Sequence, residues 1–251
     1  MFIVLIGASL IGLSLGVLGS GGAILTVPML IYGLGYSEKV AIASALVIVG
    51  SISATTALIG IKQKKVNWTL VIYFGGPSMI SAYVGAWASS YVSGSTQVMV
   101  LAIVMLAAAW RMFRSFKVQS PTQLNRSLTM MQGIGVGLLT GFVGVGGGFL
   151  IVPALVLLGG IIMSQAIFTS LVVISINSAS GFIKYQSILH ENNQLLDWPT
   201  ITLISIIGIL GSFIGQHYSM KLPQQKIKHV FAVFLTIMAI FILSQRLLSN
   251  T

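Results

Sequence analysis

Two glycine-rich stretches hold the residues whose types and spacing could do chemistry. Residues 16–28, GVLGSGGAILTVP, match residues 141–153, GFVGVGGGFLIVP, at an offset of 125, and both read G-x-x-G-x-G-G, five residues, then proline. Glycine allows a ligand or a neighbouring helix to approach the backbone closely. A helix that restarts after such a break directs unpaired N–H groups and a positive dipole end at the space before it. Because that arrangement suits an anion, the two stretches predict an anion site built on helix breaks.

Hydroxyl and amide side chains in two apolar segments, 41–61 and 162–183, are the other candidate ligands. Ser44 and Ser53 of the first segment correspond to Thr169 and Ser178 of the second, again at an offset of 125. Asn177 stands out because an amide in lipid needs a hydrogen-bond partner. For most of the hydroxyls, a bond to their own helix is an equally good interpretation. The predicted substrate-binding residues are Gly19, Ser20, Gly21, Gly22, Ser44, Ser53, Gly144, Gly146, Gly147, Gly148, Thr169, Ser170, Asn177 and Ser178, and the predicted structural helix breaks are Pro28 and Pro153.

Tight packing is the alternative interpretation of any glycine in an apolar chain, since small residues let membrane helices approach one another. At the two breaks a binding role is favoured, because irregular backbone at membrane depth must be covered by protein or line a wet cavity. No Lys-Ser/Thr pair follows the glycines, so they do not form a nucleotide-binding P-loop. We predict simple helix packing for the pairs Gly12/Gly16, Gly137/Gly141 and Gly211/Gly215.

Catalytic and metal sites have little to build on. The only carboxylates, Glu38, Glu191 and Asp197, fall in predicted loops, and the chain has three histidines and no cysteine. These positions assemble no metal-ligand cluster and no nucleophile–base pair, so we expect neither an enzyme nor a metal or other cofactor. His217 is the only candidate proton carrier, and an interfacial position is the favoured interpretation of it.

The composition places this chain in a lipid bilayer. Of its 251 residues, 56% are hydrophobic and 6% are charged, and the mean hydropathy is +1.00, whereas a soluble domain usually carries about 25% charged residues. Long continuous apolar runs predict membrane helices and not a barrel of short alternating strands. The formal charge of +10 gathers in short loops, as cytoplasmic loops of membrane proteins do, so we expect no nucleic-acid partner.

The second half of the chain repeats the first, with five apolar segments in each. The first two segments of each half are short and meet at a glycine break, so we expect them to be re-entrant or discontinuous. Trp68 and Trp198 begin the fourth segments at an offset of 130, which places five extra residues in a polar loop over 184–197. The predicted organisation is a first transmembrane repeat over 1–113, a basic cytoplasmic linker over 114–127 and a second transmembrane repeat over 128–251.

Charge predicts that the two repeats are inverted. The loop after the third segment carries three lysines, but its counterpart sets one lysine against two carboxylates. The loop after the fourth segment is uncharged, but its counterpart carries three lysines. Because positive loops stay inside, corresponding loops face opposite sides of the membrane. This places residues 62–67, 111–127 and 221–228 in the cytoplasm and both termini outside.

These residues resemble the sulfite exporter TauE/SafE family, also called the TSUP permeases. The resemblance covers essentially the whole chain. It rests on G-x-G-G-[AG]-x-L-x-V-P in both halves, on ASAL and TSL at 43–46 and 169–171, and on KKVNW and LLDW before the fourth and ninth segments. It implies a bacterial or archaeal inner-membrane transporter of small sulfur-containing anions such as sulfite, thiosulfate or organosulfonates. The first copy has Ala23 where the second has Gly148, so the two breaks need not be equivalent.

The sequence therefore predicts an all-α secondary transporter of the plasma membrane, in which the two breaks enter from opposite faces and meet near the midplane. Backbone N–H groups of the breaks and Ser, Thr and Asn side chains would hold the anion there. The expected partners are a small anionic substrate and the lipid bilayer, and the sequence leaves room for a homodimer. A passive anion channel and a non-transporting membrane scaffold subunit stay open as alternatives.

Overall fold

The computed structural model describes residues 2–19, 21–114, 125–144, 148–157, 161–219 and 224–249. Over these ranges the chain forms helices and short connections and contains no strand. Five helices are long and apolar enough to cross a membrane, and three shorter apolar ones accompany them. The predicted class, an all-α polytopic membrane protein, is confirmed.

The helices follow the predicted segments closely. The first half contains α1 (Phe2–Leu18), α2 (Gly21–Pro28), α3 (Glu38–Lys62), α4 (Trp68–Leu70), α5 (Gly76–Ala88) and α6 (Gly94–Arg114), with π-helical turns at Met29–Gly33 and Val71–Gly75 and a 3-10 turn at Ser89–Tyr91. The second half contains α7 (Arg126–Val143), α8 (Gly148–Leu157), α9 (Met163–Glu191), α10 (Trp198–Ser219) and α11 (Gln224–Ser249).

The two prolines of the glycine motifs act differently. After Pro28 the helix widens into a π-helical turn, as expected where proline removes an N–H and frees the carbonyl one turn earlier. By contrast, α8 continues as an α-helix through Pro153 to Leu157. The predicted break at Pro153 is therefore wrong, because one missing hydrogen bond does not interrupt this helix.

The segment after Ile183 also differs from the prediction. Residues 184–191 were expected in a polar loop, but α9 continues through them to Glu191. Helix continuation buries Tyr185, Ile188 and Leu189, and no glycine or proline interrupts this part of the chain. The polar connection to α10 is therefore only residues 192–197.

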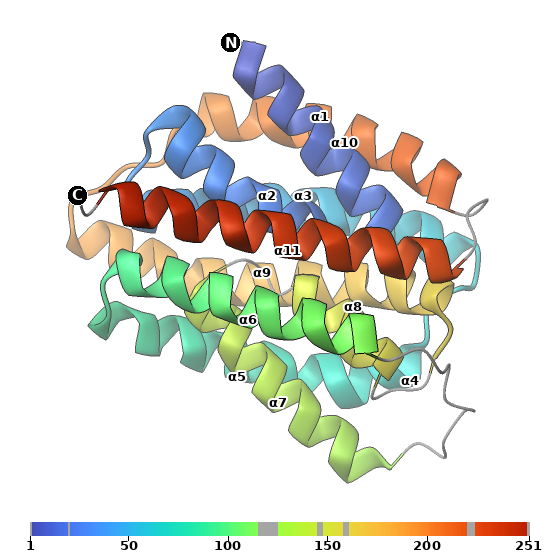
Figure 1. Ribbon diagram of the computed structural model, residues 1–251. Coiled ribbons are helices and arrows are strands. Elements are labelled where there is room, and N and C mark those ends of the chain that lie inside the picture. Colours follow the sequence, from blue (N-terminus) through green and yellow to red (C-terminus); the bar gives the residue numbers. More distant parts are fainter. Residues whose placement is uncertain are drawn as a thin grey trace.

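The helices pack as corresponding pairs around a central pair (Figure 1). Helices α3 and α9 lie in the middle; α1 packs on α10 to one side of them, and α5 packs on α7 to the other. Helices α6 and α11 lie side by side across one face. At the offsets of 125 and 130, α1 corresponds to α7 and α10 to α5, so the two outer pairs are made of equivalent segments.

Glycines bring these outer pairs into backbone contact. A Cβ atom placed on Gly12 would lie 2.2 Å from the carbonyl oxygen of Gly208, and one on Gly137 would lie 2.2 Å from that of Ser78. These four residues correspond at the two offsets (12 + 125 = 137; 208 − 130 = 78). The same close approach to backbone is found at Gly16, Gly141, Gly211 and Gly215, and the predicted packing role of all six glycines is confirmed.

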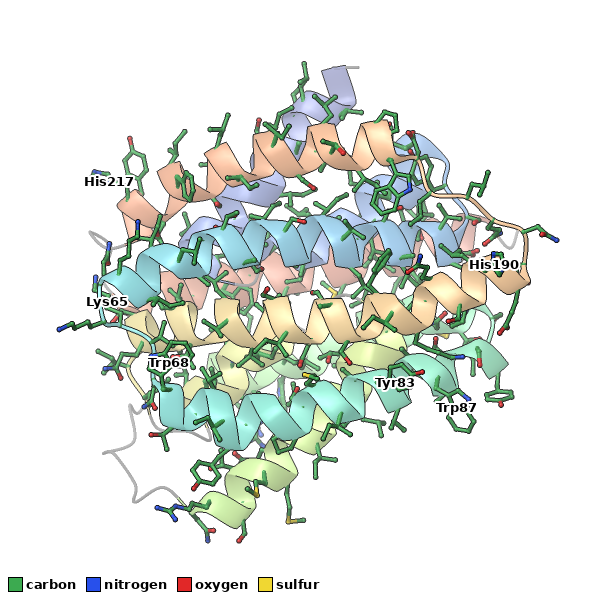
Figure 2. All side chains as sticks on the ribbon, turned by 180° about the vertical axis from the view of Figure 1, so that it is seen from behind. Lys65, Trp68, Tyr83, Trp87, His190 and His217 are labelled. Atoms are coloured by element: carbon green, nitrogen blue, oxygen red, sulfur yellow. The ribbon has the colours of Figure 1, made fainter. Side chains whose placement is uncertain are left out.

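Corresponding helices run in opposite directions (Figure 2). Lys65, Trp68 and His217 lie at one end of the molecule, called the Lys65 end below, and Trp87 and His190 lie at the other, the His190 end. Helix α3 ends beside Lys65 whereas α9 ends beside His190, and α5 and α10 are likewise opposed. Contacts between α3 and α9 agree with this arrangement. Leu46 lies against Gly181 and Gly60 lies against Phe168, so residue numbers rise along one helix as they fall along the other.

Candidate substrate site

A left-handed glycine ends the first helix of each half. Gly19 has φ +71° and Gly144 has φ +72°, a conformation that favours glycine because L side chains clash there. The N–H of Gly19 donates to the carbonyl of Leu15 at 2.8 Å, and that of Gly144 to Thr140 at 2.9 Å. Each glycine thus closes its helix with the usual left-handed cap, and the two halves of the chain share this backbone conformation at the break.

The two breaks lie at opposite ends of the central helix pair. A Cβ atom on Gly19 would lie 2.9 Å from Cα of Ile167 on α9, and one on Gly144 would lie 1.9 Å from Cγ2 of Ile42 and 3.0 Å from the hydroxyl of Tyr185. Eighteen helical residues separate 167 from 185, which is about 27 Å at 1.5 Å per residue. The prediction that the breaks meet near the midplane is therefore wrong. Helices α2 and α8, which restart after the breaks, do contact each other.

The remaining motif glycines are partly described. Gly21 and Gly22 begin α2 and are buried, and a Cβ on Gly22 would lie 2.4 Å from the carbonyl oxygen of Ile11. They therefore let α2 fold back tightly on α1. Gly148 is the first residue of α8. Ser20, Gly146 and Gly147 lie outside the described residues.

The middle of the central pair carries polar atoms that the protein itself does not satisfy. Gly50 is the central residue of α3 and Asn177 that of α9, and a Cβ on Gly50 would lie 3.0 Å from Cβ of Ser178. Around this contact the hydroxyls of Ser53 and Ser178 and the Oδ1 of Asn177 are buried, with no hydrogen-bond partner in the described part of the chain. Most buried polar atoms in proteins are paired. These three atoms therefore mark the strongest candidate binding position.

Asn177 is fixed from one side only. Its Nδ2 donates to the hydroxyl of Ser78 on α5 at 2.7 Å, and Oδ1 is left over. If the amide is turned over, Ser78 donates to Oδ1 and Nδ2 becomes the free atom. Asn177 can thus offer either a donor or an acceptor to a bound molecule. The other half has Ile52 and Gly208 at these positions, so this polar contact exists on one side of the molecule only.

The other predicted side chains have different surroundings. Ser44 is buried without a partner for its hydroxyl, but it lies six residues from Gly50, about 9 Å along the helix. Thr169 accepts a hydrogen bond from the N–H of Asn67 at 3.0 Å, and Ser170 donates to carbonyl oxygens of Ile167 and Gly19. Thr169 and Ser170 therefore tie the Gly19 break and the α4 connection to α9.

Sequence reasoning missed a polar cluster beside the Gly144 break. Lys39, Ser89, Gln97 and Tyr185 come from four separate elements and are joined by hydrogen bonds. Tyr185 is fully buried, although it had been placed at the start of a loop. One signal was available in the sequence. In the other half, Lys39 corresponds to Ser164, Gln97 to Ile227 and Tyr185 to Gly60. Only Ser89 has a like counterpart, Ser219.

The described residues contain no group of three His, Cys, Asp or Glu side chains able to hold a metal ion. A sequence profile described as "Sulfite exporter TauE/SafE" matches residues 4–242. Curated relatives are named probable membrane transporter proteins: one from Xylella fastidiosa strain Temecula1 is 27% identical over 96% of this chain and 94% of its own. Those from Methanocaldococcus jannaschii (25% identical; 93% of each chain) and Haemophilus influenzae (28%; 94% and 95%) are similar. No solved structure matches the chain.

Proposed function

Because the chain belongs to the sulfite exporter TauE/SafE family and is a membrane transporter rather than an enzyme, we propose that it moves small sulfur-containing oxyanions or organosulfonates, such as sulfite, across the plasma membrane. One observation carries the site assignment. Ser53, Asn177 and Ser178 hold unpartnered polar atoms at the middle of the two antiparallel central helices. Hydroxyls and an amide can donate to an oxyanion from several sides, and no further ligand type is needed.

The opposed helices support a transporter built from two inverted repeats, 1–113 and 128–251. In such proteins the substrate site lies near the midplane between the repeats, which is where the middle of α3 meets the middle of α9. The glycine breaks, one near each end, would then line the two access routes to that site. The central site, rather than the breaks themselves, holds the substrate in this proposal.

Charge supports an orientation with the Lys65 end in the cytoplasm. Among the described residues, the loops and helix ends there carry basic side chains and no carboxylate, while all three carboxylates lie towards the His190 end. The excess of Lys and Arg on one side sets membrane orientation. The basic residues concerned are Lys62, Lys64, Lys65, Arg111, Arg114 and Arg126.

Flux in proteoliposomes tests the central site. Sulfite uptake is compared for the wild type, Ser53→Ala, Ser178→Ala and the double variant. A hydrogen bond to a charged group is worth about 1.5–3 kcal/mol, so each single change should raise the half-saturating sulfite concentration about tenfold or more.

Ser51→Ala is the matched control, since Ser51 lies on the same helix but donates to its own backbone at Val47. Its flux should equal that of the wild type. Normal saturation by sulfite in a correctly folded Ser53→Ala/Ser178→Ala protein would refute the site assignment. A wild type that moves none of sulfite, thiosulfate or methanesulfonate would refute the proposed substrate class.

A further inference from the structure

We propose that Lys39, with Gln97 and Tyr185, forms a second binding site for the small oxyanion, at the His190 end of the route to the central site; this extends the proposed function and rests on it. The site would supply the positive charge that the central position lacks. It lies beside the Gly144 break, because a Cβ on that glycine would sit 3.0 Å from the Tyr185 hydroxyl.

Lys39 is a half-buried cation bound only to neutral oxygens. Its Nζ donates to the backbone carbonyl of Ser89 at 2.6 Å and to Oε1 of Gln97 at 2.5 Å. Among the described side chains, no carboxylate oxygen lies within the 4.0 Å that defines an ion pair with it. An ammonium group has three N–H donors, so one donor is left for a ligand, while the neighbouring Glu38 acts on the charge from beyond ion-pair distance.

Tyr185 provides a second donor next to the first. Its hydroxyl oxygen accepts a hydrogen bond from Nε2 of Gln97 at 2.6 Å. Oγ of Ser89, whose proton goes to the carbonyl oxygen of Ala86 at 2.7 Å, lies 3.0 Å away. Its own proton has two acceptors within reach, Oγ of Ser89 at 3.0 Å and the carbonyl oxygen of Phe142 at 3.4 Å. The hydroxyl can turn its proton from these two longer contacts to a bound anion, and the bond accepted from Gln97 strengthens that donation.

Gln97 occupies one group that would otherwise repel an anion. The carbonyl oxygen of Phe142 belongs to the last turn of α7, the negative end of the helix dipole. Nε2 of Gln97 donates to that oxygen. The cluster therefore presents an ammonium and a phenol proton, with the nearest helix carbonyl already occupied. A small oxyanion matches this set of donors, whether it is a free substrate or the phosphate of a lipid headgroup.

Chemical labelling of the wild-type protein tests the site directly. The purified protein is acetylated with trace acetic anhydride in phospholipid-free detergent, in chloride or in methanesulfonate at equal ionic strength, and labelling at each lysine is measured by mass spectrometry. Methanesulfonate should lower labelling of Lys39 at least fivefold and leave Lys184 unchanged. Equal labelling of Lys39 in both salts would overturn the proposal. Protection by phosphatidylglycerol vesicles alone would also overturn it, since the occupant would then be a lipid.

Transport by three variants separates this proposal from the previous one. Losing one charge-assisted bond should raise the half-saturating anion concentration about tenfold in Lys39→Met, and Lys39→Arg should restore most of it. Lys184→Met is the matched control, because it removes the same charge from the same end of the molecule. An equal effect in Lys184→Met would reduce the role of Lys39 to general surface charge and refute the site. Protection of Lys39 in a protein that transports no sulfur oxyanion would refute the proposed substrate but keep this site.

Discussion

Replacing Gly144 with alanine tests how the second helix break is seated against the rest of the protein. Two costs are expected. A non-glycine residue at φ +72° costs about 1–2 kcal/mol. The new Cβ would also lie 1.9 Å from Cγ2 of Ile42, and forcing an extra carbon into packed surroundings costs about 1–3 kcal/mol. Together the free energy of unfolding should fall by about 2–5 kcal/mol.

Gly35 separates these two costs. It has almost the same conformation, φ +71°, but a Cβ there would meet no atom within 4 Å. Gly35→Ala should therefore lose only the conformational cost, about 1–2 kcal/mol. Gly76 has neither a positive φ nor a near neighbour and lies at the start of α5, so Gly76→Ala should be neutral or slightly stabilising. The expected order of stability is Gly76→Ala, wild type, Gly35→Ala, Gly144→Ala, with the first two close together.

Reversible unfolding in mixed micelles with increasing SDS, followed by tryptophan fluorescence, measures the difference. Adding Ile42→Ala should recover part of the loss, because it removes the methyl group that the new Cβ would strike. We expect a coupling energy of about 1–2 kcal/mol between the two positions. Equal losses in Gly144→Ala and Gly35→Ala, with no coupling to Ile42, would show that the break does not rest on α3.

Two further predictions use the same unfolding assay. Gly16→Ala and Gly141→Ala should each lower the free energy of unfolding by about 1–3 kcal/mol, because a Cβ there would lie 2.1 Å from the carbonyl oxygen of Ser212 and 1.9 Å from that of Ala82. Gly135→Ala is the control, since a Cβ there would meet no atom within 4 Å. A loss in only one of the two variants would contradict the equivalence of the two helix interfaces. Hydrogen bonds from Thr200 and then Tyr36 hold the pKa of the exposed Asp197 below its usual range. A carboxyl group whose pKa is lower in the folded state stabilises the fold above the unfolded pKa, and this contribution is lost as the pH falls through the folded pKa. The wild type should therefore lose a small amount of stability below about pH 4, and Asp197→Asn should not.

The sequence pattern predicted where the helices break and where they cross closely, because the causes are local. A left-handed cap needs glycine at one position, and a close helix crossing needs small residues one turn apart. Both requirements can be recognised from spacing alone, as the pairs Gly19/Gly144 and Gly12/Gly137 demonstrate. Repetition at a fixed offset then separated these glycines from others in an apolar chain.

The depth of the breaks could not be predicted in the same way. It depends on where α1 and α7 dock along α9 and α3, and that is decided by contacts such as Gly19 with Ile167, 148 residues apart in the chain (167 − 19 = 148). The Lys39 cluster has the same origin, since its members come from four elements. Periodicity describes one helix at a time, so it does not show which faces of different helices meet.

Differences between the repeats bear most directly on transport. Related halves would give a transporter two equivalent ends, and an anion would then be held equally well at both. Here Lys39 and Tyr185 correspond to Ser164 and Gly60, and a Cβ on Gly60 would lie 2.4 Å from the ring of Phe168. An aromatic ring thus fills the space at the Lys65 end that a polar hydroxyl fills at the His190 end. Nζ of Lys65 lies 5.4 Å from the centroid of that ring, whereas Nζ of Lys39 donates to polar oxygens. The two ends of the proposed route therefore hold their cations in different surroundings, and Lys39→Met should weaken anion binding at the His190 end alone.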